Sequence, residues 1–66
     1  MKFEELTTDY DWQQAMVYAN FKAEDIAEIV NSQIGVHDEL DWILLVRLKD
    51  GGFGWLRAGC DYTGWD

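Results

Sequence analysis

The sequence predicts one α+β domain over residues 1–66, with two N-terminal helices packed on a C-terminal antiparallel β-hairpin or small sheet. Three observations predict this fold. Apolar residues up to Val30 recur with the period of a helix, the residues from Trp42 onward are β-branched and aromatic, and Asp50-Gly51 is a strong hairpin-turn signal. The chain has no proline, repeat or linker to divide it.

The size of the chain makes its core the main source of stability. A domain this short buries only about 60% of the surface that its unfolded chain exposes. One cysteine excludes an internal disulfide, and no Cys/His cluster is present for a structural zinc. The ten aromatic residues, four of them Trp, must therefore supply much of the burial, since each can bury roughly 150–250 Å².

The first helix is predicted over Asp9 to Ala19. Thr8 is its expected N-cap, with Asp11 three positions on in a capping-box arrangement. Four apolar residues then share one helical face, which indicates a core stripe. They are Trp12, Ala15, Met16 and Ala19.

The second helix is predicted over Ala23 to Ser32, and Gly35 is expected to end it. Glu24 and Glu28 are like charges four positions apart, which costs a few tenths of a kcal/mol. Two explanations stay open. The acids serve a contact with a partner, or Glu24 and Asp25 stabilise the helix N-terminus. Val36 to Asp41 is expected to be an acidic connecting loop.

The hairpin is predicted to join Trp42–Leu48 to Phe53–Arg57 through a two-residue turn at Asp50-Gly51. This register puts Leu48 opposite Phe53, Val46 opposite Trp55, and Leu44 opposite Arg57. The apolar residues of these pairs would face the helices, together with Trp42. The second face would hold Ile43, Leu45 and Leu56, covered by a third strand, by the C-terminal segment or by a second molecule.

The C-terminal segment, residues 58–66, is expected to fold back over that second face. In this interpretation Tyr62 and Trp65 cover Ile43, Leu45 and Leu56. Cys60 is a small buried side chain, and Asp61 caps local amides.

The charge is strongly acidic, with 13 Asp and Glu against five Lys and Arg and a net charge of −8. The whole excess lies in residues 1–41, which hold ten acids and two bases. Such a surface repels nucleic acids and anionic lipids and attracts basic proteins. A winged DNA reader would need a basic recognition helix, so direct nucleic-acid binding is not expected. The N-terminus has no export-signal pattern and no apolar run is long enough to span a bilayer, which predicts a cytoplasmic protein that does not enter a membrane.

Two stretches of the sequence resemble a group of small acidic proteins of bacteriophages and mobile elements whose function is uncharacterised. The stretches are Asp41-Trp42 through Leu48-Lys49-Asp50-Gly51, and Ala58-Gly59-Cys60-Asp61-Tyr62-Thr63-Gly64-Trp65-Asp66. The resemblance covers residues 21–66, including Asp25-Ile26-Ala27-Glu28. In those relatives a Cys-Gln follows the final Trp-Asp, whereas the sequence here stops at Asp66. It is left open whether a second thiol, with a redox or metal role, has been lost from this protein.

The sequence does not predict an enzyme, a cofactor or a metal. Cys60 and His37 are a possible nucleophile and base, but no third group is indicated to orient them. His37, Asp38, Glu39, Asp41 and Cys60 lack the regular spacing of metal ligands. The glycines from Gly51 to Gly54 lie between strands and not before a helix, so they do not form a phosphate loop.

The function predicted from these observations is a non-enzymatic inhibitor that imitates a row of phosphates and blocks a basic, nucleic-acid-binding surface of a host protein. The resemblance to phage proteins makes an anti-CRISPR-like role, directed at a CRISPR effector, a specific expectation. The predicted contact residues are Glu24, Asp25, Glu28, Asp38, Glu39 and Asp41. The alternative is a structural or regulatory module that self-associates through an apolar sheet face, so either a monomer or a homodimer is expected.

Overall fold

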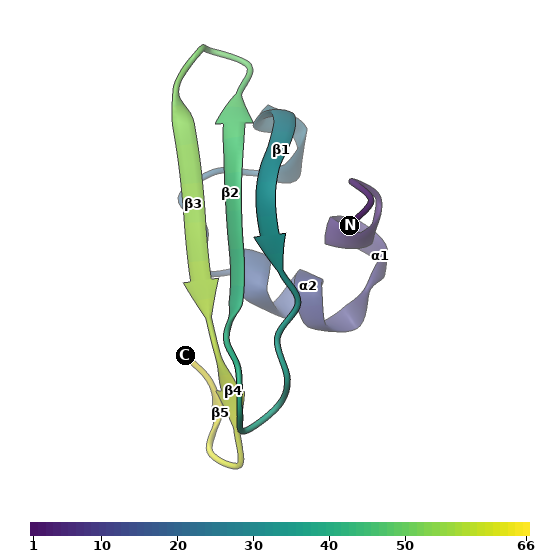
Figure 1. Cartoon of the computed structure of the whole chain (residues 1–66), viewed down its shortest axis with the longest axis vertical. Coiled ribbons are helices and arrows are strands. Elements are labelled where there is room, and N and C mark those ends of the chain that lie inside the picture. Colours follow the sequence, from purple (N-terminus) through teal and green to yellow (C-terminus); the bar gives the residue numbers. More distant parts are fainter.

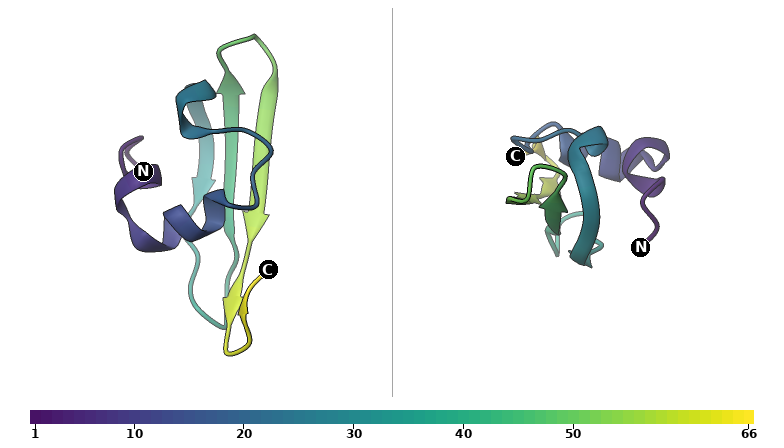
Figure 2. Two further views of the ribbon diagram at one scale, coloured as in Figure 1. Left: turned by 180° about the vertical axis from the view of Figure 1, so that it is seen from behind. Right: turned by 90° about the horizontal axis from the view of Figure 1, so that it is seen from above.

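The computed structural model describes all 66 residues and confirms the α+β class with two N-terminal helices. The elements are α1 (Glu5–Thr8), α2 (Tyr10–Met16), a 3₁₀ turn η1 (Ala23–Asp25), β1 (Ile26–Gln33), β2 (Trp42–Leu48), β3 (Phe53–Ala58), β4 (Cys60–Asp61) and β5 (Gly64–Trp65). β1, β2 and β3 form an antiparallel sheet in that order, and β4 pairs with β5. The helices cover one face of the sheet (Figures 1 and 2). No helix is long and apolar enough to cross a bilayer.

The first predicted helix is shorter than expected, because α2 ends at Met16 and not at Ala19. Its N-cap is Asp9, whose Oδ2 accepts a hydrogen bond of 3.0 Å from the Trp12 backbone N–H. Thr8 is not the cap, since its Oγ1 donates to the Glu4 carbonyl at 2.8 Å and closes α1. The N-cap of α2 is therefore one residue later than the predicted Thr8.

The second predicted helix is wrong: residues 23–32 form η1 and most of β1. The ladder with β2 shifts between Ile26 and Glu28 and again between Ile29 and Asn31. Because of these two bulges, Ile26, Ile29 and Ser32 lie on the same side of the sheet although they are three positions apart. Their partners in β2 are Leu48, Val46 and Leu44. That interval imitates a helical period, which is why the periodicity was misleading.

The hairpin register is displaced by one residue from the prediction. The loop has three residues, Lys49 to Gly51: the Leu48 N–H donates to the Gly52 carbonyl at 2.7 Å, and only Gly51 has a positive φ, of 95°. A two-residue turn at Asp50-Gly51 would need positive φ at Asp50, at both residues in type I′ and at the first in type II′, and Asp50 does not have it. Leu45 is consequently opposite Trp55, and Arg47 opposite Phe53. Because side chains alternate, this step places Phe53 and Trp55 on the face away from the helices.

The core lies between the helices and the sheet, and it holds the side chains that β2 and β3 direct inward. Leu6 and Trp12 come from the helices and pack with Leu44 and Leu56, each no more than 2% exposed. The full set of buried apolar residues is Leu6, Trp12, Ala15, Phe21, Ile26, Trp42, Leu44, Val46, Leu56 and Ala58. Gly54 allows the Phe21 ring to approach, because a Cβ there would lie 2.7 Å from the ring.

The C-terminal segment does not cover the second face of the sheet, so that prediction is wrong. Gly59 and Asp66 exchange two backbone hydrogen bonds of 3.1 and 3.0 Å, which turns the chain back in the β4–β5 hairpin. Trp65 then packs on Trp42 with ring centroids 4.9 Å apart. Tyr62 is 94% exposed at the tip. The predicted capping by Asp61 is confirmed, because its carboxylate accepts from the Thr63 N–H at 2.8 Å.

Candidate functional site

The sheet has one uncovered face, which we call the open face, turned toward the viewer in Figure 1. The strand register places three residues of each strand on it. They are Glu28, Asn31 and Gln33 from β1, Ile43, Leu45 and Arg47 from β2, and Phe53, Trp55 and Arg57 from β3. The apolar side chains of the open face therefore all lie on β2 and β3, and Arg47 and Arg57 lie in its two end rows.

This apolar group exposes two aromatic side chains, both on the edge strand β3. Phe53 and Trp55 are each 68% exposed, and Ile43 and Leu45 beside them are each 37% exposed. Single exposed apolar residues are ordinary, but a contiguous group on one sheet face marks an interaction site. Aromatic side chains are also the residues most enriched in the energetic centres of interfaces.

Ion pairs flank this apolar group. Arg47 bonds Glu28 at 2.6 Å across the β1–β2 ladder, and Arg57 bonds Asp41 at 2.6 Å. All four side chains are between 35% and 68% exposed, so each pair adds little to stability. Their effect is local: two of the five basic residues lie on the open face and offset the carboxylates there.

The six predicted contact acids do not share one surface. Glu24 and Asp25 lie in η1 at the β2–β3 turn, where the Asp25 carbonyl accepts from the Lys49 N–H at 2.9 Å. Asp38, Glu39 and Asp41 lie at the β1–β2 connection, at the other end of a molecule 37 Å long. Glu28 is on the open face. The expected single row was wrong because it assumed a helix in place of β1.

The β1–β2 connection and the C-terminal hairpin form an acidic end. A shallow hollow of about 340 Å³ there is lined by Asp38, Glu39, Asp41, Asp61 and Asp66, together with Gly59 and Cys60. No three His, Cys, Asp or Glu side chains in the chain are arranged to hold a metal ion. Burial raises the pKa of the Cys60 thiol, and Asp11, Asp38, Asp61 and Asp66 raise it further. The thiolate is thus disfavoured, and with it nucleophilic chemistry.

His37 does not activate Cys60. Its Nε2 contacts Asp11 Oδ1 at 3.1 Å, and its ring meets Trp42 and Trp65 edge to face at 5.3 and 5.9 Å. The Cys60 Sγ donates instead to the Asp61 carbonyl at 3.9 Å. His37 therefore joins α2, the β1–β2 connection and the tail.

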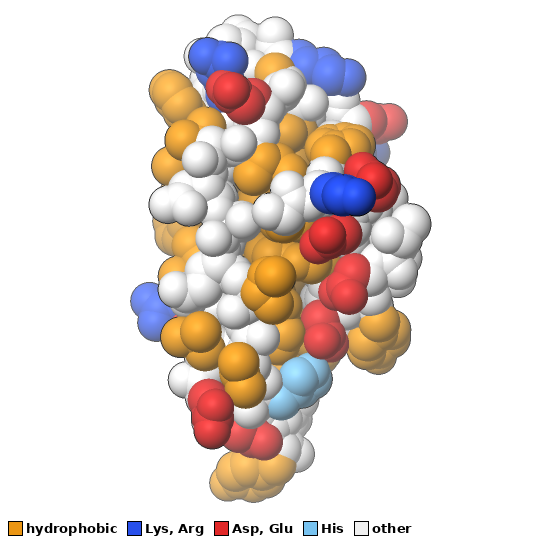
Figure 3. All heavy atoms as spheres, turned by 45° about the vertical axis from the view of Figure 1, so that its right-hand side comes forward, with side chains coloured by type: hydrophobic (Ala, Val, Ile, Leu, Met, Phe, Trp, Pro, Cys, Tyr) orange, Lys and Arg blue, Asp and Glu red, His pale blue; other side chains and the backbone are white.

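A line of acidic side chains that sequence reasoning did not select runs along the side where the helices meet β1. Figure 3 shows it above the pale-blue His37. The residues before α2 and in its first turn include four acids, Glu4, Glu5, Asp9 and Asp11, and Asp11 contacts His37. Their dense charge was the available signal, but the sequence assigned Asp11 only to a capping box and Asp9 only to the start of the helix.

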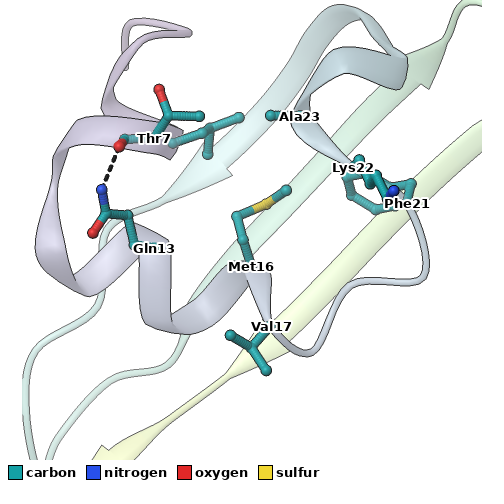
Figure 4. A pocket seen from close by; sticks show the side chains of 8 residues that line it. Thr7, Gln13, Met16, Val17, Phe21, Lys22 and Ala23 are labelled. Carbon is teal, nitrogen blue, oxygen red and sulfur yellow. Dashed lines mark hydrogen bonds between the residues drawn. The ribbon is translucent and has the colours of Figure 1, made fainter.

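A second hollow, of about 400 Å³, lies between the helices and η1 (Figure 4). Leu6, Met16 and Phe21 make it largely apolar, and Lys22 is its one charged residue. The Gln13 side chain donates to the Thr7 carbonyl at its rim. It holds no carboxylate, thiol or imidazole, so Lys22 is its one ionisable side chain.

Comparison with protein-family models, with curated proteins and with solved structures gives no match to this chain.

Proposed function

We propose that this protein is a non-enzymatic interaction module of the cytoplasm that binds a basic partner protein through the open face. The observation that carries the proposal is the exposure of Phe53 and Trp55, 68% each, side by side on the β3 side of that face. A soluble domain that already lacks apolar area for its own core would gain stability by burying both rings. Leaving them exposed is costly unless another protein covers them.

The two rings can supply most of the affinity. At 68% exposure each offers roughly 100–170 Å² for burial, or about 3 kcal/mol at ~25 cal/mol per Å². Association entropy takes up much of this gain, so the neighbouring Ile43 and Leu45 must be excluded from water as well. Arg47 and Arg57 then lie at the rim, where charged residues set orientation more than affinity.

The net charge of −8 selects the class of partner. Three of the 13 acidic side chains take part in ion pairs, which leaves ten without a cation in bonding distance. This field attracts a basic protein over about one Debye length, roughly 8 Å at physiological salt, and raises the rate of encounter.

The test is capture from a bacterial lysate by the immobilised protein. Replacing both Phe53 and Trp55 by Ser should abolish capture of basic proteins without loss of fold, because neither ring is in the core. Tyr62→Ser is the matched control, since this aromatic residue is 94% exposed but lies in the tail. Equal capture by the double variant and by the control would refute the role of the open face.

The second candidate is the phosphate mimic, an inhibitor of a nucleic-acid-binding host protein such as a CRISPR effector. The acidic end favours it, because four of its five carboxylates lack a cation in bonding distance. Asp38→Asn with Glu39→Gln should then weaken capture, and double-stranded DNA should displace the captured protein. Asn is chosen because residue 38 has φ 69°, a conformation that Asn tolerates. Capture insensitive to both the substitutions and the DNA would exclude mimicry.

A further inference from the structure

The two edges of the sheet differ in how they are protected against pairing with another strand. β1 and β3 are the edge strands. The β1 ladder is interrupted by two bulges, which are a common protection against strand addition. The β3 ladder runs from Phe53 to Ala58 without a shift, and these residues include no proline and no lysine. β3 is therefore the unprotected edge.

The hydrogen bonds around β3 show which of its backbone groups point outward. Gly52 bonds toward β2, through Leu48, and Cys60 bonds toward the same side, through Asp38. Gly59 comes one position before Cys60, and its backbone groups bond to Asp66 on the side away from β2. Since alternate residues of an antiparallel strand bond to opposite sides, the N–H and C=O groups of Phe53, Trp55 and Arg57 point outward. These outward N–H and C=O groups bond to no other backbone group of the chain.

We propose that the β3 edge pairs with the β3 edge of a second copy of this chain, antiparallel and about a two-fold axis, with the two Trp55 residues opposite each other. In this register each Phe53 lies opposite Arg57 of the other copy. The three outward residues of each strand then exchange up to six backbone hydrogen bonds. The pairing also places Trp55 beside Trp55 and a guanidinium beside an aromatic ring, both favourable cross-strand pairs.

Charge favours this edge as the place where two such acidic molecules meet. β3 carries Arg57 and no carboxylate, whereas the acids concentrate in the N-terminal residues, η1 and the acidic end. The chain's own Asp66 pairs with Gly59 at the end of this edge, so the free outward groups are those of Phe53, Trp55 and Arg57.

The small area of the interface makes this dimer weak. Pairing of one short strand covers less than the ~800 Å² per partner of a standard stable interface. Two molecules of charge −8 also repel each other, and added salt screens that repulsion. We therefore expect a dimer that populates at high protein concentration and strengthens as salt rises. It would join two three-stranded sheets and merge both open faces into one binding surface, a consequence that rests on the proposed function.

The test is disulfide trapping in a Cys60→Ser background. Trp55→Cys should form a covalent dimer at least tenfold faster than Tyr62→Cys, an exposed position that reports random collision. Residues opposite each other in a hydrogen-bonded antiparallel pair have Cα atoms about 5.5 Å apart, within disulfide range. In a face-to-face sandwich they would be about 10 Å apart, outside that range. Equal rates for the two variants would overturn the edge pairing.

Sedimentation equilibrium of otherwise unmodified chains gives an independent readout. The average mass of the wild type should rise from 7.7 kDa toward twice that value with concentration. Trp55→Pro removes an outward N–H that β2 does not use, so it should stay monomeric, while Trp55→Ala should still associate. A wild type that stays at 7.7 kDa at millimolar concentration in high salt would overturn the proposal. Neither result bears on capture through Phe53 and Trp55, which tests the open face separately.

Discussion

Gly35 is the position where one methyl group should do the most damage. A Cβ there would lie 2.2 and 2.3 Å from two carbons of the Trp42 ring and 2.7 Å from the Leu40 carbonyl oxygen. Carbon atoms in contact prefer separations of about 3.5–4.0 Å. Trp42 is 2% exposed and packs against Trp65, so its ring has no free space to enter.

The cost of Gly35→Ala follows from this overlap. Overpacking costs ~1–3 kcal/mol, and we expect the upper end, about 3 kcal/mol. For a domain of this size each kcal/mol shifts Tm by ~4–8 °C, which gives a fall of about 12–24 °C. The whole stability of such a chain is ~3–10 kcal/mol, so the variant should lie close to unfolding at room temperature.

Thermal unfolding followed by circular dichroism is the assay, with Gly51→Ala as the matched control. Residue 51 has φ 95° but nothing within 4 Å of its Cβ position, so it isolates the backbone penalty, about 1 kcal/mol. A Tm for Gly35→Ala equal to or above that of Gly51→Ala would refute the packing argument.

Two further predictions concern ionisable groups of the tail. The pKa of Cys60 is raised first by burial and then by Asp11, Asp38, Asp61 and Asp66, so iodoacetamide at pH 8 should alkylate it more slowly than a cysteine in a disordered peptide. Asp38→Asn with Asp66→Asn should speed the reaction, and an unchanged rate would contradict the electrostatic part. Hydrogen bonds from the Thr63 side chain and then its N–H lower the pKa of Asp61 below 3.8, so this group stabilises the fold above about that pH and ceases to as pH falls through the lower folded value. NMR titration of Thr63→Ala should show the pKa of Asp61 rising toward 3.8; a value no higher than in the wild type would contradict the assignment.

Local sequence was enough to predict the elements that follow a regular pattern. The core face of α2, with Trp12 and Ala15, and the strand from Trp42 to Leu48 both have an uninterrupted period. β1 could not be predicted this way, because its bulges give Ile26 and Ile29 a helical spacing. Only the pairing with β2, which is distant in sequence, decides between the two structures.

The second sheet face was predicted to hold Ile43 and Leu45, which the structure confirms, but it was predicted to be covered by the C-terminal segment and to hold Leu56 in place of Phe53 and Trp55. Its composition depends on whether the turn at Asp50-Gly51 has two residues or three. One extra residue in the turn moves each side chain of β3 to the opposite face of the sheet. Both turns suit the same Asp-Gly signal, so the sequence favoured the commoner one. The position of the tail depends on the pair of hydrogen bonds between Gly59 and Asp66, for which the sequence carries no signal.

The four tryptophans lie in contrasting surroundings. Trp12 and Trp42 are 1% and 2% exposed, Trp65 is half-buried, and Trp55 is 68% exposed. Acrylamide should thus quench Trp55 first, and a bound protein should shield that emission while the core indoles stay unchanged. Denaturant should shift the emission of Trp12 and Trp42 to the red. One unlabelled molecule consequently carries separate fluorescent reporters for occupancy and for unfolding.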